Sequence, residues 1–168
     1  FNNQLGQDSL ESILFGASVN LWGGTFSGLY STFTNDNPGL VIGLSSLLIS
    51  QGVPAAAATL VENAYTNALR QDGDLFNIGY RMTTGPNTFY VAYSAHNDKT
   101  SFDADTASYG VAYSYALSKR TDLNFVYTRF DNSGLGQAAP GQAGFLGGVT
   151  QSAGTDSNSF AFGIRHRF

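Results

Sequence analysis

The sequence has no cysteine, few charges and no long apolar run. Without cysteine among its 168 residues, disulfides, thiol catalysis and thiolate metal sites are all excluded. Only 12% of the residues are charged, the formal net charge is −4 and no basic run appears, so no nucleic-acid partner is expected. No stretch approaches the ~20 consecutive apolar residues that a membrane-spanning helix needs, because the longest apolar segment, 40–49, is broken by glycine and serine. A helical membrane protein is therefore excluded.

The sequence is rich in glycine and in aromatic residues that alternate with small ones. It holds 20 Gly, 13 Phe and 9 Tyr, a mixture that favours strands over helices. Successive side chains of a strand point to opposite faces, so alternation of bulky and small residues predicts a strand with two unlike faces. The segments that alternate are 12–22, 26–33, 74–84, 88–96, 106–116, 122–130 and 158–168. For 26–33 alone, the pattern does not fix which residues face inward.

The seven predicted strands are joined by connections that alternate in length. Segments 23–25, 84–87 and 117–121 predict tight turns, and the connections between them are longer. Tight turns at one end and long loops at the other are typical of an antiparallel up-and-down β-barrel that spans an outer membrane. A soluble β-sandwich is the weaker alternative, because the bulky residues of a sandwich would face a common core.

The two faces predict which solvent each one meets. One parity carries Phe, Tyr, Val and Ile, and the other carries mainly Gly, Ala, Ser, Thr and Asn, which could not fill a core. The bulky face would suit contact with lipid, and the small-residue face would suit contact with water. The aromatic residues expected at the membrane interfaces are Tyr113, Tyr115, Tyr127, Phe160 and Phe168. Barrel and orientation would both be refuted if Phe76, Tyr80, Val91, Phe125 and Phe162 shared one interior.

Residues 34–72 interrupt the strand pattern with helical spacing. Asn37 and Pro38 predict a helix start, Gly52 a stop and Pro54 the start of a second helix. We therefore expect two short helices in a long outer loop, acting as a lid or as a plug that narrows the lumen. An eighth strand at 40–49 is the alternative, although its apolar positions do not alternate. The Gly-rich segment 131–157 predicts a second long outer loop.

Three segments carry a family resemblance. The closing "FGIRHRF", the turn "YALSKRTDLNFVYTRF" and the Gly-rich loop between them resemble general-diffusion porins of Gram-negative bacteria, most closely the beta-proteobacterial type. The resemblance covers roughly residues 73–168. It implies that residues 1–168 are the C-terminal part of one barrel domain of about 16 strands, usually trimeric, with tight turns in the periplasm and long loops outside.

The candidate functional residues belong to the small-residue face or to the last strand. The pore-lining candidates are Arg81, Asn77, Tyr90, His96, Asn124, Arg165 and Arg167. Arginines on a wet wall favour anions, although Arg165 and Arg167 could instead pair with carboxylates near the periplasmic mouth. The resemblance implies a terminal-strand assembly signal made of Gly163, His166 and Phe168, which barrel-assembly machinery would bind as an exposed strand edge.

No catalytic, metal or cofactor site is expected. Ser94, His96 and Asp98 follow one another at alternate positions of one strand, which does not align them as a hydrolase triad. His96 and His166 are expected far apart and on opposite faces, which argues against a shared metal, and Asp103 with Asp105 would hold a divalent ion only weakly.

The sequence predicts an integral outer-membrane porin for passive diffusion of small hydrophilic solutes and ions. The expected partners are outer-membrane lipid, the assembly machinery, two further copies in a homotrimer and the permeating solutes. The alternatives are a barrel enzyme, lipase or protease, and a small barrel serving as an anchor or adhesin.

Overall fold

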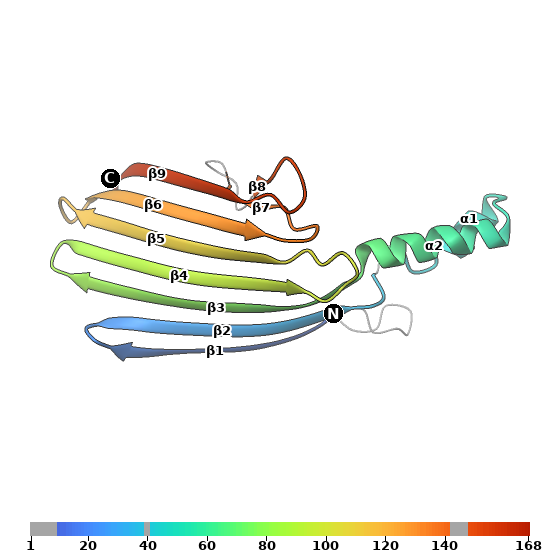
Figure 1. The fold of residues 1–168 in the computed structure, drawn as a ribbon, viewed down its shortest axis with the longest axis horizontal. Helices are drawn as coiled ribbons and strands as arrows, with labels where there is room; N and C mark the ends of the chain where they lie inside the picture. The colour runs from blue at the N-terminus through green and yellow to red at the C-terminus, as the bar shows by residue number, and fades with distance from the viewer. Residues whose placement is uncertain (1–9, 39–40, 142–147) are drawn as a thin grey trace. The chain divides into compact units, whose positions relative to one another are not determined.

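The computed structural model describes residues 10–38, 41–141 and 148–168 (Figure 1). Most of these residues form one seven-stranded sheet, whose strands follow the order of the chain except that β9 lies beside β6. The strands of this sheet are β1 (Glu11–Leu21), β2 (Gly24–Asn35), β3 (Gln71–Thr84), β4 (Asn87–Asp98), β5 (Thr106–Ala116), β6 (Thr121–Asn132) and β9 (Ser157–His166). All seven predicted strands are confirmed. Neighbouring strands run antiparallel in the pairs β4–β5, β5–β6 and β6–β9.

The chain forms two compact units. One consists of residues up to 13 together with 32–73, and it holds helices α1 (Leu44–Ser50) and α2 (Ala55–Leu69). The other consists of residues 14–31 and 74–168, which carry most of the sheet. Within the described residues neither helix combines the length and apolarity needed to cross a membrane.

The bulky face of the sheet is confirmed by two rows of aromatic rings. One row crosses four strands, with ring centroids 5.0 Å apart between Phe89 and Tyr113, then 6.3 Å to Phe125 and 4.8 Å to Phe162. The other row joins Phe76, Tyr93 and Tyr109 across three strands. Cross-strand aromatic pairs of this kind hold the register of the sheet, because a shift by one residue would turn each ring to the opposite face.

The bulky residues of this face do not gather into a core. Val91 is 55% exposed and Phe162 is 58% exposed, while Phe76 and Phe125 are also exposed. Among the described residues, the only buried hydrophobic side chains are Val41 and Ala58, and both lie in the unit that carries the helices. The sheet is thus a single layer with an uncovered apolar face, which is the opposite of a sandwich. In the described part of the chain the sheet is open, with β1 and β9 at its two edges.

The helices of segment 34–72 differ from the prediction at their starts. The first begins at Leu44 rather than beside Asn37 and Pro38, because Gly43, with φ 80°, precedes it as the N-cap. The carboxylate of Glu62 on α2 accepts a hydrogen bond from the backbone N–H of Ser45. Gly52 follows the end of α1 as predicted, with φ 90°, and Pro54 is the N-cap of α2 rather than its first residue. Since residues 44–50 are helical, the alternative of an eighth strand at 40–49 is wrong.

Two connections also differ in detail from the sequence-based prediction. The turn after β1 is centred on Trp22 and Gly23, with φ of 51° and 78°, and Gly24 already belongs to β2. The expected turn at 23–25 is therefore one residue too late. The Gly-rich segment 131–157 contains a small hairpin of β7 (Ala138–Ala139) and β8 (Gly148–Val149), which the sequence did not indicate.

Candidate functional site

The small-residue face of the sheet is lined at mid-height by side chains that are short or absent. The strand register aligns Ala92, Gly110, Thr128 and Ser159 from β4 to β9. On β3, a Cβ added to Gly79 would lie 3.9 Å from the Cβ of Ala92 and 3.6 Å from the Oγ of Ser27 on β2. The row thus continues across six strands and places Ser27 on this face, which the sequence alone left open for its strand.

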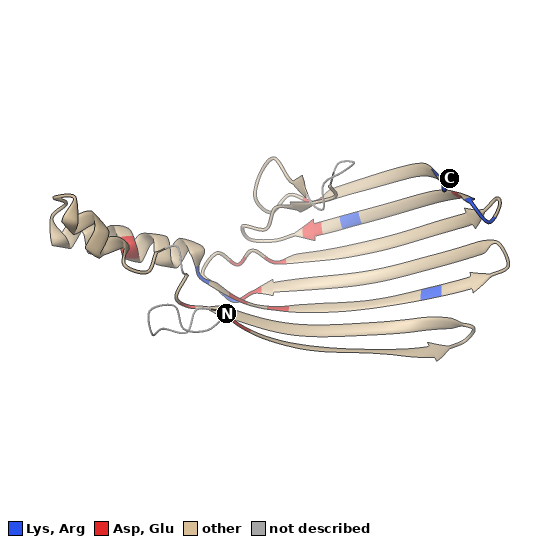
Figure 2. Ribbon diagram, turned by 180° about the vertical axis from the view of Figure 1, so that it is seen from behind, with Lys and Arg blue, Asp and Glu red and all other residues tan. Residues whose placement is uncertain are grey.

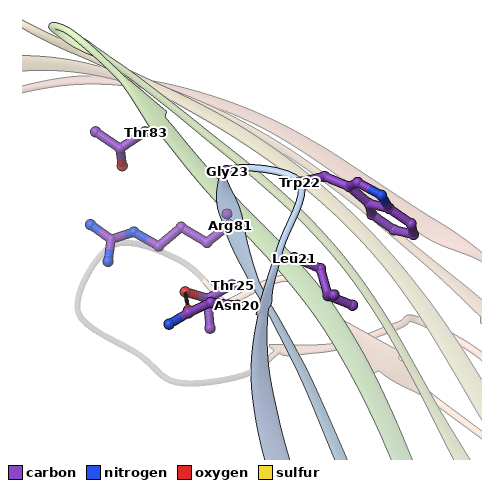
Figure 3. A pocket seen from close by; sticks show the side chains of 8 residues that line it. Asn20, Leu21, Trp22, Gly23, Thr25, Arg81 and Thr83 are labelled. Atoms are coloured by element: carbon purple, nitrogen blue, oxygen red, sulfur yellow. Dashed lines mark hydrogen bonds between the residues drawn. The ribbon is translucent and has the colours of Figure 1, made fainter.

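Arg81 stands at the end of this face that is nearest the short turns. Its guanidinium carbon lies 5.6 Å from the centre of the Tyr90 ring, within range of a cation–π contact. With Asn20, Thr25 and Thr83, it borders a cavity of about 360 Å³ beside the β1–β2 turn (Figure 3). Arg81 and Tyr90, both predicted for this face, are therefore neighbours.

The asparagines predicted for the small-residue face also have partners there. The amide of Asn77 donates a hydrogen bond to the hydroxyl of Ser94 on the neighbouring strand. The amide of Asn124 donates to the carboxylate of Asp122 over 2.6 Å. Both asparagine side chains are therefore held in place by hydrogen bonds to neighbouring polar residues.

Arg165 is paired with a carboxylate, which was one of the two interpretations of this residue that the sequence allowed. Its Nη2 and Nε donate to one oxygen of Asp122 over 2.7 and 3.0 Å, and the register places the two residues directly opposite each other. The backbone N–H of Arg167 donates to the carbonyl of Arg120 in the β5–β6 turn. The two predicted arginines of the last strand thus lie beside a short turn, away from the loop end of the sheet.

The two histidines are separated. The register pairs His96 with Thr106 at the loop end, whereas Nδ1 of His166 lies 2.9 Å from the hydroxyl of Thr121 at the turn end. Across the described residues no group of three His, Cys, Asp or Glu side chains is arranged to hold a metal ion. The carboxylate of Asp98 accepts hydrogen bonds from the N–H groups of Thr100 and Ala104, so it caps its own loop.

The charges of residues 14–31 and 74–168 are divided between the two ends of the strands. Six carboxylates and two cations lie at the loop end, at Asp74, Asp98, Lys99, Asp103, Asp105, Arg129, Asp131 and Asp156. Five cations and one carboxylate lie at the turn end, at Arg81, Lys119, Arg120, Asp122, Arg165 and Arg167. Figure 2 shows this separation along the strands, with acidic positions where the long loops begin.

Two groups of ion pairs at the loop end were not predicted from the sequence. Arg129 donates to Asp131 and, over 3.1 Å, to Asp156, while Lys99 pairs with Asp74 at 2.8 Å. The register places Arg129 opposite Tyr109, on the bulky face. In the sequence, the sign of this feature was that the charged Arg129 occupies a position of the bulky parity in β6. Such a charge marks where the apolar band of that face ends.

A comparison with protein families decides the assignment. A family model described as Gram-negative porin matches residues 2–135, which is most of the chain. The chain belongs to the Gram-negative porin family. Like the family, this porin is an outer-membrane protein built on β-barrel architecture, and its strand-rich sheet agrees with that assignment. No curated protein and no solved structure matches the chain.

The extent of the family match adds to the resemblance noted in the sequence. The match includes the helical segment 34–72, which the resemblance had left out, and it ends at residue 135, near the start of the Gly-rich loop and before the terminal strand. The porin assignment therefore does not depend on the motif at the end of the chain. It points to a channel rather than to an enzyme.

Proposed function

We propose that this porin forms the wall of a water-filled channel for passive diffusion of small hydrophilic solutes and ions. The observation that carries the proposal is the inverted sheet, whose bulky face is uncovered while the opposite face carries small and polar side chains. Lipid stabilises an exposed aromatic surface, and a hydrated lumen tolerates glycine, serine and arginine. Solute choice would follow from pore width and wall charge rather than from a binding site.

The proposed orientation places the short turns in the periplasm and the long loops outside. In this arrangement Arg81 faces the lumen, with Asn77, Tyr90, His96, Asn124 and Arg165 as further wall residues. The cation–π contact with Tyr90 supports this role, because it fixes the long Arg81 side chain without neutralising its charge.

The proposal extends to assembly as a homotrimer with the help of barrel-assembly machinery. Gly163 and His166 of β9, together with Phe168 just beyond its end, would be recognised at this edge of the described sheet. The ring of His166 lies 4.9 Å from that of Phe168, edge to face, so the imidazole packs as an aromatic ring would, which supports its place in this signal.

Planar-bilayer recording of the full chain tests the channel. We expect stepwise conductance, and we expect Arg81→Glu to shift the reversal potential in a salt gradient toward cation preference, because it reverses one charge on the wall. Arg81→Lys keeps the charge and is the matched control, so it should leave the reversal potential nearly unchanged.

The proposal is wrong if membrane-inserted protein gives no current steps. Hydrolysis of esters or peptides by the non-conducting protein would support a barrel enzyme instead. Conductance that is indifferent to Arg81→Glu would keep the channel and remove Arg81 from its wall.

A further inference from the structure

The only tryptophan of the chain occupies a backbone conformation that bulky residues avoid. Trp22 has φ 51°, and among the described residues the only other non-glycine with positive φ is Asp103. Left-handed backbone is uncommon for residues other than Gly, Asn and Asp, and for a bulky residue it is an outlier that calls for an explanation. The indole is also 86% exposed, so packing against the protein does not supply one.

The turn around Trp22 is held firmly in this strained form. Trp22 and Gly23 both have positive φ, as the two central residues of a type I′ hairpin turn require. The hydroxyl of Tyr80 on β3 contacts the carbonyl oxygens of Leu21 and Trp22, at 3.1 and 3.0 Å. A Cβ at Gly24 would lie only 2.6 Å from the Tyr80 ring, so the ring fits there because Gly24 has no side chain.

The ordinary solution for this turn is Asn followed by Gly, which adopts positive φ with little strain. The chain instead places its single tryptophan at that position. The backbone strain at Trp22 is therefore offset by a property of the indole that asparagine lacks.

The indole lies on the apolar side of the turn. In Figure 3 the Trp22 side chain points away from Arg81 and Thr83 and lies on the same side as Leu21. Leu21, Val19 and Phe15 continue this exposed apolar surface along β1. Residues 14–31 contain no charged side chain, so the strand segments next to this turn carry no charge that would disfavour contact with a membrane.

We propose that Trp22 is an interfacial anchor, which the strained turn holds among the phospholipid headgroups of the leaflet that meets the short turns. The inference rests on the proposed membrane orientation of the sheet. Tryptophan prefers this layer because its ring is apolar and its N–H finds polar partners there. Lys119 and Arg120, in another short turn, would meet the same layer and suit anionic headgroups.

Because Trp22 is the only tryptophan, the fluorescence of the full chain in vesicles reports on this one site. The vesicles contain phosphatidylcholine and phosphatidylglycerol with a quencher placed either on the headgroup or at mid-chain, and iodide quenches from the water. We expect blue-shifted emission that the headgroup quencher largely removes, with weaker quenching by the mid-chain label and by iodide. The control Trp22→Asn with Val149→Trp carries its tryptophan at an exposed site of β8 and should be quenched by iodide alone.

A second measurement separates anchoring from stability. Trp22→Asn relieves the backbone strain, so we expect the refolded variant to resist urea at least as well as the original protein. Without the indole, we expect it to insert into vesicles several-fold more slowly.

Each outcome has a distinct meaning. If conducting protein shows iodide quenching equal to that of the Val149→Trp control, or quenching mainly at mid-chain depth, the anchor is refuted and the channel stands. If Trp22→Asn inserts as fast as the original protein, Trp22 has no anchoring role. If the protein neither conducts nor shows lipid quenching at any depth, the channel and the anchor fall together.

Discussion

At the scale of single residues, one ion pair joins the last two strands near the short turns. Asp122 is mostly shielded, with 13% of its side chain exposed, whereas Arg165 is 59% exposed. Exposure of the arginine weakens the attraction, so a double-mutant cycle of Asp122→Asn and Arg165→Gln should give a small but measurable favourable coupling free energy. Urea unfolding from lipid vesicles measures it. Arg81→Gln with Asp122→Asn is the control pair, and its effects should be additive because the two residues share no partner. Coupling of the same size in both cycles would contradict the cross-strand pair.

At the scale of elements, the helical hairpin depends on a bond between its two helices. The hydroxyl and the backbone N–H of Ser45 bind the Glu62 carboxylate and lower the pKa of Glu62 below its ordinary value. A carboxyl whose pKa is depressed by folding stabilises the fold above its ordinary pKa, and this contribution is lost as pH falls through the lowered value. Glu62→Gln should therefore speed hydrogen exchange in residues 44–50 at neutral pH. The difference from the original protein should vanish in acid.

The control for this experiment is Thr59→Val on the same helix, which removes only a hydrogen bond from the Thr59 hydroxyl to the carbonyl of Ala55. It should leave exchange in residues 44–50 unchanged at every pH. Equal exchange in Glu62→Gln and the original protein at neutral pH would show that Glu62 does not hold α1.

Sequence and structure agree on elements whose signal is local and disagree where the signal comes from elsewhere in the fold. Strand faces were predictable because alternation is written along each strand, and β6 shows it with Phe125 facing one side and Asn124 the other. The start of α1 was not, because Gly43 and the distant Glu62 set it rather than Asn37 and Pro38. Strands as short as β7 and β8 cannot show an alternation of side chains, so the sequence does not reveal them. For the predicted pore-lining residues, the alternation in the sequence predicted which face of the sheet they occupy. Their neighbours could be identified only from the structure.

At the scale of the sheet as a whole, residues 14–31 and 74–168 carry opposite charge at the two ends of the strands. Such a separation makes the potential at the two mouths of the proposed channel unequal, so ions enter from the two sides at different rates. We expect unequal currents at opposite voltages when the protein inserts in one direction. Lys119→Gln with Arg120→Gln should reduce this asymmetry, whereas Lys119→Arg with Arg120→Lys keeps both charges and should preserve it.

Salt distinguishes this electrostatic origin from pore shape. At about 1 M salt the screening length falls to about 3 Å, so exposed charges at the turns no longer act across the mouth. An asymmetry caused by the separated charges should therefore fade as salt increases. An asymmetry that persists at high salt, and that is unchanged when Lys119 and Arg120 are both replaced by Gln, would come from the shape of the lumen. Recording each variant at low and high salt decides between the two, because shape is unaffected by screening whereas the charge effect depends on it.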